Sequence, residues 1–115
     1  MALSNEQKTR LLDTLDGSFI SLHASDPGTD GSGEISGSGY VRYPAVFTPT
    51  KDGVKKLLDE AKFENLRGCT ITHFGLFSNK TGDGFLVGGK LLTPRTLLPG
   101  DGFKFKPGSI SFGAE

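Results

Sequence analysis

The sequence predicts a mainly β protein, a small antiparallel β-sandwich of jelly-roll-like type with one N-terminal helix. The run Cys69–Phe77 is β-branched and aromatic, with apolar side chains at both parities, which is typical of a strand at the centre of a packed β structure. Short alternating segments and Gly-rich turns surround it, and 17 of the 115 residues are glycine. The length fits one domain, 1–115, with a helical arm over 1–17 and a β domain over 18–115.

The helical arm is predicted from its capping residues. Ser4 is a good N-cap, Gln7 completes a capping box and Gly17 is a natural stop. A helix of about three turns is too short to persist alone, so its apolar stripe must pack on another surface. We expect that surface to be either the protein's own sheet or a neighbouring subunit. The stripe consists of Leu11, Leu12 and Leu15.

A strand over Ser18–Ala24 follows. Its apolar residues of one parity are expected to face the core, and they are Ile20, Leu22 and Ala24. Ser21 and His23 lie on the other face. A turn at Asp26–Gly28 leads into a loop over Thr29–Gly39 that is almost all small and polar. Loops of this length in a compact domain are often functional or mobile.

The middle of the chain is less regular. Tyr40–Tyr43 is expected to be extended, and Pro44 favours the edge of a sheet. Lys51–Asn65 is compatible with a helical face or with a strand; we expect a loop and then a strand near Glu60–Phe63.

The C-terminal half reads as strands joined by tight turns. Ser78–Gly84 predicts a hairpin turn, and Phe85–Leu92 a returning strand with a bulge or close approach at its glycine pair. A connection over Thr93–Gly100 is expected next. Alternating phenylalanine, isoleucine and polar residues then predict two half-buried strands, around 103–106 and 109–112.

The charge balance argues against a partner held by phosphate neutralisation. Thirteen basic and thirteen acidic residues give a formal net charge of zero, so nucleic acid is not expected, whereas self-association is easy. The single cysteine fits folding in a reducing cytoplasm, and no signal or membrane-inserting segment is expected.

No catalytic or metal-binding motif stands out. His23 and His73, even with Asp26 or Glu34, match no metal spacing, and the Cys69–His73 pair lacks a third orienting group. The glycine-serine runs lack the lysine of a P-loop. We therefore expect no enzyme activity, no cofactor and no metal.

Four residues beside the glycine-rich loop are candidates for an interface or recognition surface. Glu34 and Arg42 are either a weak surface pair or a clamp that folds the loop back. Tyr40 and Tyr43 either offer recognition area with a polar tip or simply pack the base of the loop.

Four segments taken in order resemble small bacteriophage virion proteins of the tail fibre or minor tail type. They are Leu22–Gly28, Glu34–Arg42, Thr72–Phe77 and Thr81–Gly84, and the resemblance covers about residues 18–113. Ser78 and the charged Lys51–Asn65 segment depart from the family pattern. The resemblance implies a structural role in the virion, assembly through symmetric contacts and no catalysis.

The expected function is therefore a phage tail fibre or minor tail component. Its expected partners are itself, in a homo-oligomer such as a trimer, other virion proteins and a host-surface ligand. A capsid decoration protein is the alternative within the same class. A monomeric glycan-binding β domain, which uses Tyr40 and Tyr43, is the alternative from another class.

Overall fold

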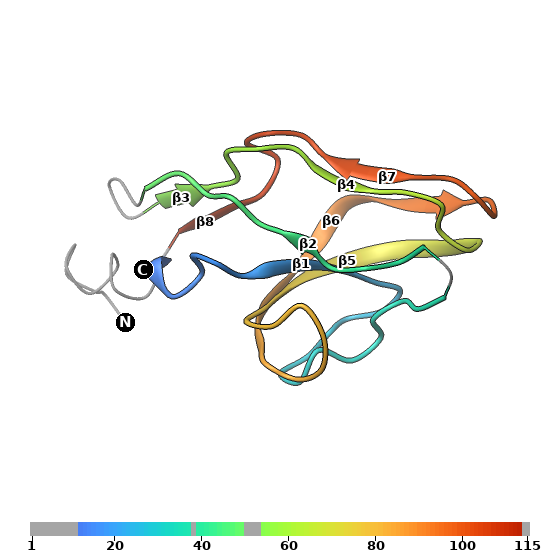
Figure 1. Ribbon diagram of the computed structural model, residues 1–115, viewed down its shortest axis with the longest axis horizontal. Coiled ribbons are helices and arrows are strands. Elements are labelled where there is room, and N and C mark those ends of the chain that lie inside the picture. The colour runs from blue at the N-terminus through green and yellow to red at the C-terminus, as the bar shows by residue number, and fades with distance from the viewer. Residues whose placement is uncertain (1–11, 38, 50–53, 114–115) are drawn as a thin grey trace.

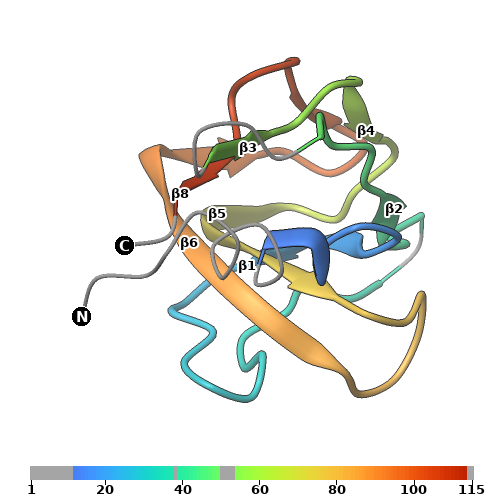
Figure 2. The same ribbon diagram turned by 90° about the vertical axis from the view of Figure 1, so that its left-hand side faces the viewer.

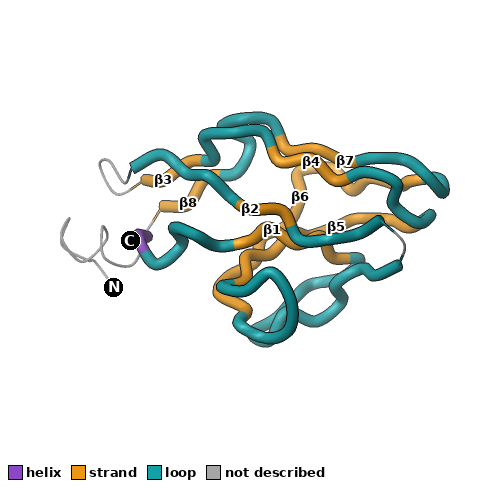
Figure 3. Tube along the Cα trace, viewed as in Figure 1, coloured by secondary structure: helices purple, strands orange, loops and turns teal. Residues whose placement is uncertain are grey.

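The computed structural model describes residues 12–37, 39–49 and 54–113, and these form short loops and antiparallel strands (Figures 1 and 3). The mainly β, antiparallel class predicted from the sequence is confirmed. The strands are β1 (Phe19–His23), β2 (Tyr43–Pro44), β3 (Val54–Lys56), β4 (Ala61–Phe63), β5 (Cys69–Phe77), β6 (Phe85–Leu97), β7 (Phe103–Phe105) and β8 (Ser111–Gly113).

Strand β5 lies inside the largest sheet, whose order is β2-β1-β5-β6. β1 pairs along one side of it, with Phe19 opposite Phe77, and β6 pairs along the other side. Apolar residues of both parities, Ile71 and Leu76, are fully buried. The expected central strand over Cys69–Phe77 is therefore confirmed, and so is the edge position of Pro44 in β2.

Strand β6 runs further than predicted. The connection expected over Thr93–Gly100 begins only after Leu97, because the strand continues through Pro94. Lys90 pairs with His73 and Arg95 pairs with Ile71, so residues 91–94 lie opposite one residue of β5. This bulge at a sheet edge accommodates the proline, because the ladder needs no N–H from it there.

The glycine pair of β6 is a point of close approach. Gly88 and Gly89 stay in register with Gly75 and Phe74, so the bulge is not here. A Cβ added to Gly89 would lie 2.7 Å from the ring of Phe74. Only a residue without a side chain lets the ring approach the backbone this closely.

Two short ribbons form a second layer, one pairing β3 with β8 and the other β4 with β7. Leu57 joins them through bonds to the chain around Ile110 and Gly108. Lys51–Asn65 therefore contributes β3 and the expected strand, β4; within its described part, 54–65, the helical alternative is not found. The additional strand β3 was not predicted.

The two layers enclose the core (Figures 1 and 2). Phe105 of β7 meets Phe74 of β5 with ring centroids 5.8 Å apart, and Phe63 of β4 lies 6.4 Å from Phe105. Ile20, Leu22 and Ile71 add fully buried aliphatic side chains from the large sheet. The hydrogen bonds define three separate sheets, so the jelly-roll-like sandwich stays a prediction.

The N-terminal helix is not supported. Residues 1–11, including Ser4, Gln7 and Leu11, lie outside the described residues; only Leu12 and Asp13 are helical, and a turn follows over 14–17. Leu12 and Leu15 are buried in the core of the chain itself. The docking of a helical stripe on the protein's own sheet or on a neighbouring subunit stays a prediction.

Strand β1 is buried on both faces, which corrects its expected pattern. Ile20 and Leu22 face the core as predicted, but Ala24 lies beyond the strand and is exposed. Ser21 and His23 on the other face are also fully buried. The loop after β1 passes on that side of the sheet, away from the two ribbons, and covers it (Figures 1 and 2).

Candidate functional site

The glycine-rich loop folds back on β1. The amide of Ala24 donates to the carbonyl of Gly33, and the amide of Ile35 donates to the carbonyl of Leu22. Between these two bonds, His23 and Glu34 lie opposite each other as an isolated antiparallel β-bridge. Gly31 has φ +83°, and a Cβ there would lie 2.6 Å from the ring of Phe77. The loop is thus a packed cover for the sheet.

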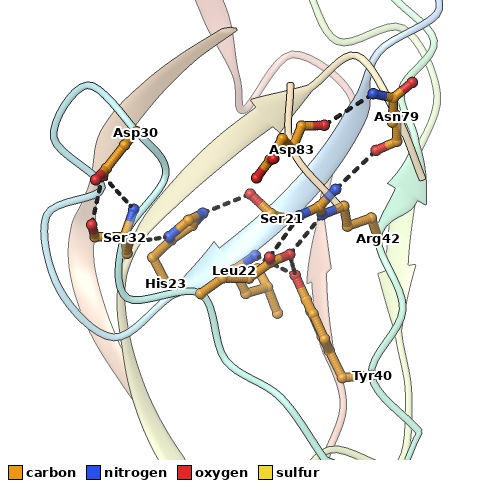
Figure 4. A network of polar contacts seen from close by, with 10 residues as sticks. Ser21, Leu22, His23, Asp30, Ser32, Tyr40, Arg42, Asn79 and Asp83 are labelled. Atoms are coloured by element: carbon orange, nitrogen blue, oxygen red, sulfur yellow. Dashed lines mark hydrogen bonds and ion pairs between the residues drawn. The ribbon is translucent and has the colours of Figure 1, made fainter. Parts of the chain in front are cut away.

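Glu34 and Arg42 form the clamp that holds this cover, and Figure 4 shows Arg42 within the surrounding polar network. Nε and Nη2 of Arg42 donate to the two carboxylate oxygens of Glu34, each at 2.8 Å. Nη1 donates to the carbonyl of Asn79 at 3.0 Å, and the guanidinium lies 3.5 Å from the ring centroid of Phe77. Arg42 therefore ties the loop, the hairpin turn and β5 together.

Tyr40 completes the polar network. Its hydroxyl donates to Glu34 at 2.6 Å and accepts from the amide of Leu22 at 3.1 Å. The Tyr40 ring stacks on Phe63, and Tyr43 is tilted against the same ring, both at 6.1 Å. Both tyrosines pack the base of the loop, and their part in recognition stays a prediction.

The charges of this network support one another. Burial of the Glu34 carboxyl opposes its ionisation, but hydrogen bonds from Arg42 and Tyr40 outweigh burial and hold its pKa below the ordinary value. Hydrogen bonding to Glu34 raises the pKa of Arg42. Burial, and then the bond to Glu34, raises the pKa of the Tyr40 hydroxyl. Glu34 and Arg42 stay ionised and Tyr40 stays neutral at neutral pH.

Ser21 and His23 form a second polar pair that resembles half of a hydrolase triad. Nδ1 of His23 donates to the carbonyl of Ser32 at 2.8 Å, which leaves Nε2 to accept from the Ser21 hydroxyl at 2.6 Å. Both side chains are fully buried, with the His23 ring stacked parallel to Phe77. A substrate therefore has no access to the hydroxyl, and the arrangement is a fixed core contact.

Lys55 of β3 is a buried charged group that the sequence analysis did not identify. Its side chain is 1% exposed, and its ammonium donates to Asp16 at 2.9 Å and to the carbonyl of Thr48 at 3.1 Å. Asp13 adds a carboxylate at 3.6 Å. This ion pair fastens the turn around Leu12 and Leu15 to the second layer.

Two surface hollows accompany these contacts. A cavity of about 290 Å³ lies between the glycine-rich loop and the hairpin turn, with Glu34, Arg42 and Lys80 among its lining residues. A second, of about 380 Å³, lies against β4, β7 and the end of β6. The alternation of phenylalanine with lysine over 103–106 predicted a half-buried strand, but the hollow beside it was not predicted.

The described part of the chain offers few other chemical groups. Among residues 12–37, 39–49 and 54–113, no three histidine, cysteine or acidic side chains gather closely enough to hold a metal ion. No helix within those residues is long and apolar enough to cross a membrane.

Comparison with known proteins adds one finding. Residues 8–113 match the family described as Podophage GP4 fiber I protein gp80. A search of the curated proteins finds no match. The matched range spans every strand of the fold and the whole clamp network.

Proposed function

The chain belongs to the family of the podophage GP4 fiber I protein gp80, and from this premise we propose that it is a non-enzymatic subunit of the tail fibre or the adjacent tail. Membership makes it a structural protein of a phage virion. We propose further that it is synthesised and folded in the host cytoplasm and works by binding copies of itself and other virion proteins. The family match over 8–113 is the observation that carries this proposal.

The polar networks support a structural role. Glu34, Arg42 and Tyr40 form hydrogen bonds with one another and with backbone groups. Ser21 and His23 are sealed in the core. Groups fixed in this way hold a loop in place and rigidify a domain, which suits a subunit that must keep its shape in a particle.

The outer side of β6 is the surface that we propose for association with a second copy. Within the described residues, no strand pairs with this edge of the large sheet. Leu86 and Leu92 expose apolar side chains on β6, and Leu98 exposes another just after it. Because the net charge is zero, copies approach one another without long-range repulsion.

Immunogold labelling of intact particles tests the location. Gold at the tail or its fibres is the expected result, with pre-immune serum as control. Gold spread over the head would replace the fibre proposal by the alternative of a capsid decoration protein. Particles that give no gold and no signal from the same antibody after dissociation would contradict both, whereas a signal only after dissociation would mean that the epitope is masked, and tagged protein would then locate the chain.

Native mass measurement tests association. We expect an oligomer, and we expect Leu92→Ser to shift it toward the monomer. Val41→Ser is the matched control, because Val41 is also an exposed apolar residue but lies outside β6. A monomer at all concentrations would instead favour the glycan-binding alternative, in which Tyr40 and Tyr43 take part.

A further inference from the structure

The cavity against β4, β7 and the end of β6 concentrates positive charge. Its lining includes Lys62, Arg95, Lys104 and Lys106, against a single carboxylate, that of Glu64. The volume of about 380 Å³ falls in the range of small-molecule sites. In a chain of zero net charge, four cations around one hollow are a local excess that the rest of the surface must balance.

The register of the β4–β7 ribbon places two of these lysines directly opposite each other. Lys62 pairs with Lys104 across the ladder. Like charges in facing positions destabilise a strand pair, so this arrangement costs stability in the free protein. Glu60 approaches Lys104 at 3.7 Å, but both side chains are largely exposed, so the ion pair relieves little of the repulsion.

Arg95 supplies a different kind of donor from the neighbouring strand. Its guanidinium lies over the ring of Phe103, 5.5 Å from the centroid. An arginine stacked on an aromatic ring keeps the N–H groups at its edge free to donate, and their planar fork matches the oxygens of a phosphate or carboxylate. The ammonium groups of Lys62 and Lys104 add charge to the same hollow.

We propose that this cavity binds an acidic saccharide, by its phosphate or carboxylate group. The charge selects an anion, and the hollow, which Phe63 and Phe103 help to line, has room for a sugar unit beyond the charged group. Nucleic acid fits less well, because the chain has no net excess of basic residues to neutralise a run of backbone phosphates. The source of the saccharide as a host-surface glycan rests on the proposed fibre function, but the binding itself does not.

Amide NMR titration of the purified protein tests the site. The probes are glucose 6-phosphate, glucuronate, glucose, inorganic phosphate and an oligothymidylate. We expect both acidic sugars to shift the amides of 62–64 and 102–106, glucose to shift none of them, and inorganic phosphate to bind at least about threefold more weakly than glucose 6-phosphate because it lacks the sugar contacts.

Two variants separate binding from folding. Lys62→Gln is expected to weaken glucose 6-phosphate roughly threefold to fivefold, as removal of one exposed charge contact does. Its melting temperature should hold or rise, because the repulsion from Lys104 is gone. Lys56→Gln, the matched control, removes an exposed lysine of β3 at the other end of the same layer and should leave affinity unchanged (Figure 1).

Specific results would overturn the proposal. Equal binding of glucose and glucose 6-phosphate would remove the role of the charges, and equal losses in Lys62→Gln and Lys56→Gln would remove the role of this cavity. Inorganic phosphate as tight as the sugar phosphate would refute the saccharide, and tighter binding of an oligothymidylate would assign the charge to nucleic acid. Particle labelling and native mass stay independent of all four results, so failure here leaves the fibre proposal standing.

Discussion

Arg42→Ala is the substitution that most directly tests how the loop is held. Arg42 is 7% exposed and joins three segments that are distant in sequence. The change removes the two bonds to Glu34, the bond to the carbonyl of Asn79 and the contact with the Phe77 ring. It leaves Glu34 with Tyr40 as its remaining side-chain donor.

The magnitude follows from these contacts. Removal of one partner of a buried ion pair costs about 3–5 kcal/mol. The Glu34 side chain is 21% exposed and keeps its bond to Tyr40, so water and the phenol offset part of that cost. The lost cation–π contact adds about 1 kcal/mol. We expect the free energy of unfolding to fall by about 3 kcal/mol and the melting temperature by roughly 10 °C.

Urea unfolding at pH 7, followed by circular dichroism, measures this loss. Arg67→Ala is the matched control, because Arg67 is exposed, and its change should stay within about 0.5 kcal/mol. A loss below about 1 kcal/mol for Arg42→Ala would refute the clamp, since it would place the network among ordinary surface pairs.

The pH dependence of Arg42→Ala gives an independent check. The pKa of Glu34 lies below its ordinary value of 4.5 in the folded protein, so the unfolded chain binds the proton more readily. The clamp therefore stabilises the fold fully above about pH 4.5, and this contribution is lost as the pH falls through the folded pKa. Arg42→Ala should flatten that part of the stability profile.

Further predictions concern the other buried contacts. Burial lowers the pKa of His23 below 6.5, so stability should be full above about pH 6.5 and decline as the pH falls toward the folded pKa; urea midpoints at pH 7.5 and 5.5 measure a slope that His23→Gln should remove. Asp16→Ala leaves the buried ammonium of Lys55 with a weaker partner and should cost about 1–3 kcal/mol by thermal unfolding; an unchanged melting temperature would contradict the ion pair. Gly31→Ala should cost more than Gly82→Ala, because both have positive φ but only Gly31 faces a ring; equal losses, about 1 kcal/mol each, would mean that the loop yields freely.

The strands that the sequence predicted best are those whose side-chain pattern follows directly from burial. Cys69–Phe77 is apolar at both parities because strands pair on both sides of it and layers cover both of its faces. Phe103–Phe105 alternates because one face of the ribbon meets the core and the other meets water. The local sequence pattern is enough to predict a strand when its apolar positions face the core and its polar positions face water.

The sequence failed to predict features that depend on contacts between residues distant in the chain. Lys55 looks like a surface lysine, but Asp16 neutralises it at a buried position and β3 forms around it. Pro94 signals the end of a strand, but the bulge absorbs it and β6 continues. Ser21 and His23 were placed only on the face of β1 opposite the core, and the returning loop that buries this face was not predicted.

In the candidate site too, some contacts could be predicted from the sequence and others depend on the folded chain. Proximity of Glu34 and Arg42 was predicted as one alternative because their charges flank the second half of the loop. The carbonyl of Asn79 and the ring of Phe77 could not be foreseen, because the hairpin turn and β5 reach Arg42 only in the folded chain. The cation cluster of the second cavity depends on cross-strand register in the same way.

The bulge of β6 interrupts the open edge of the large sheet. An open sheet edge is a template on which chain after chain can add without end, and fibrillar growth follows when nothing interrupts it. Here the edge is broken at residues 91–94, where Pro94 has no N–H to offer and β6 departs from regular register. In the association proposed through β6, a neighbour can cover the exposed leucines at and beside this break without starting a continuous ladder.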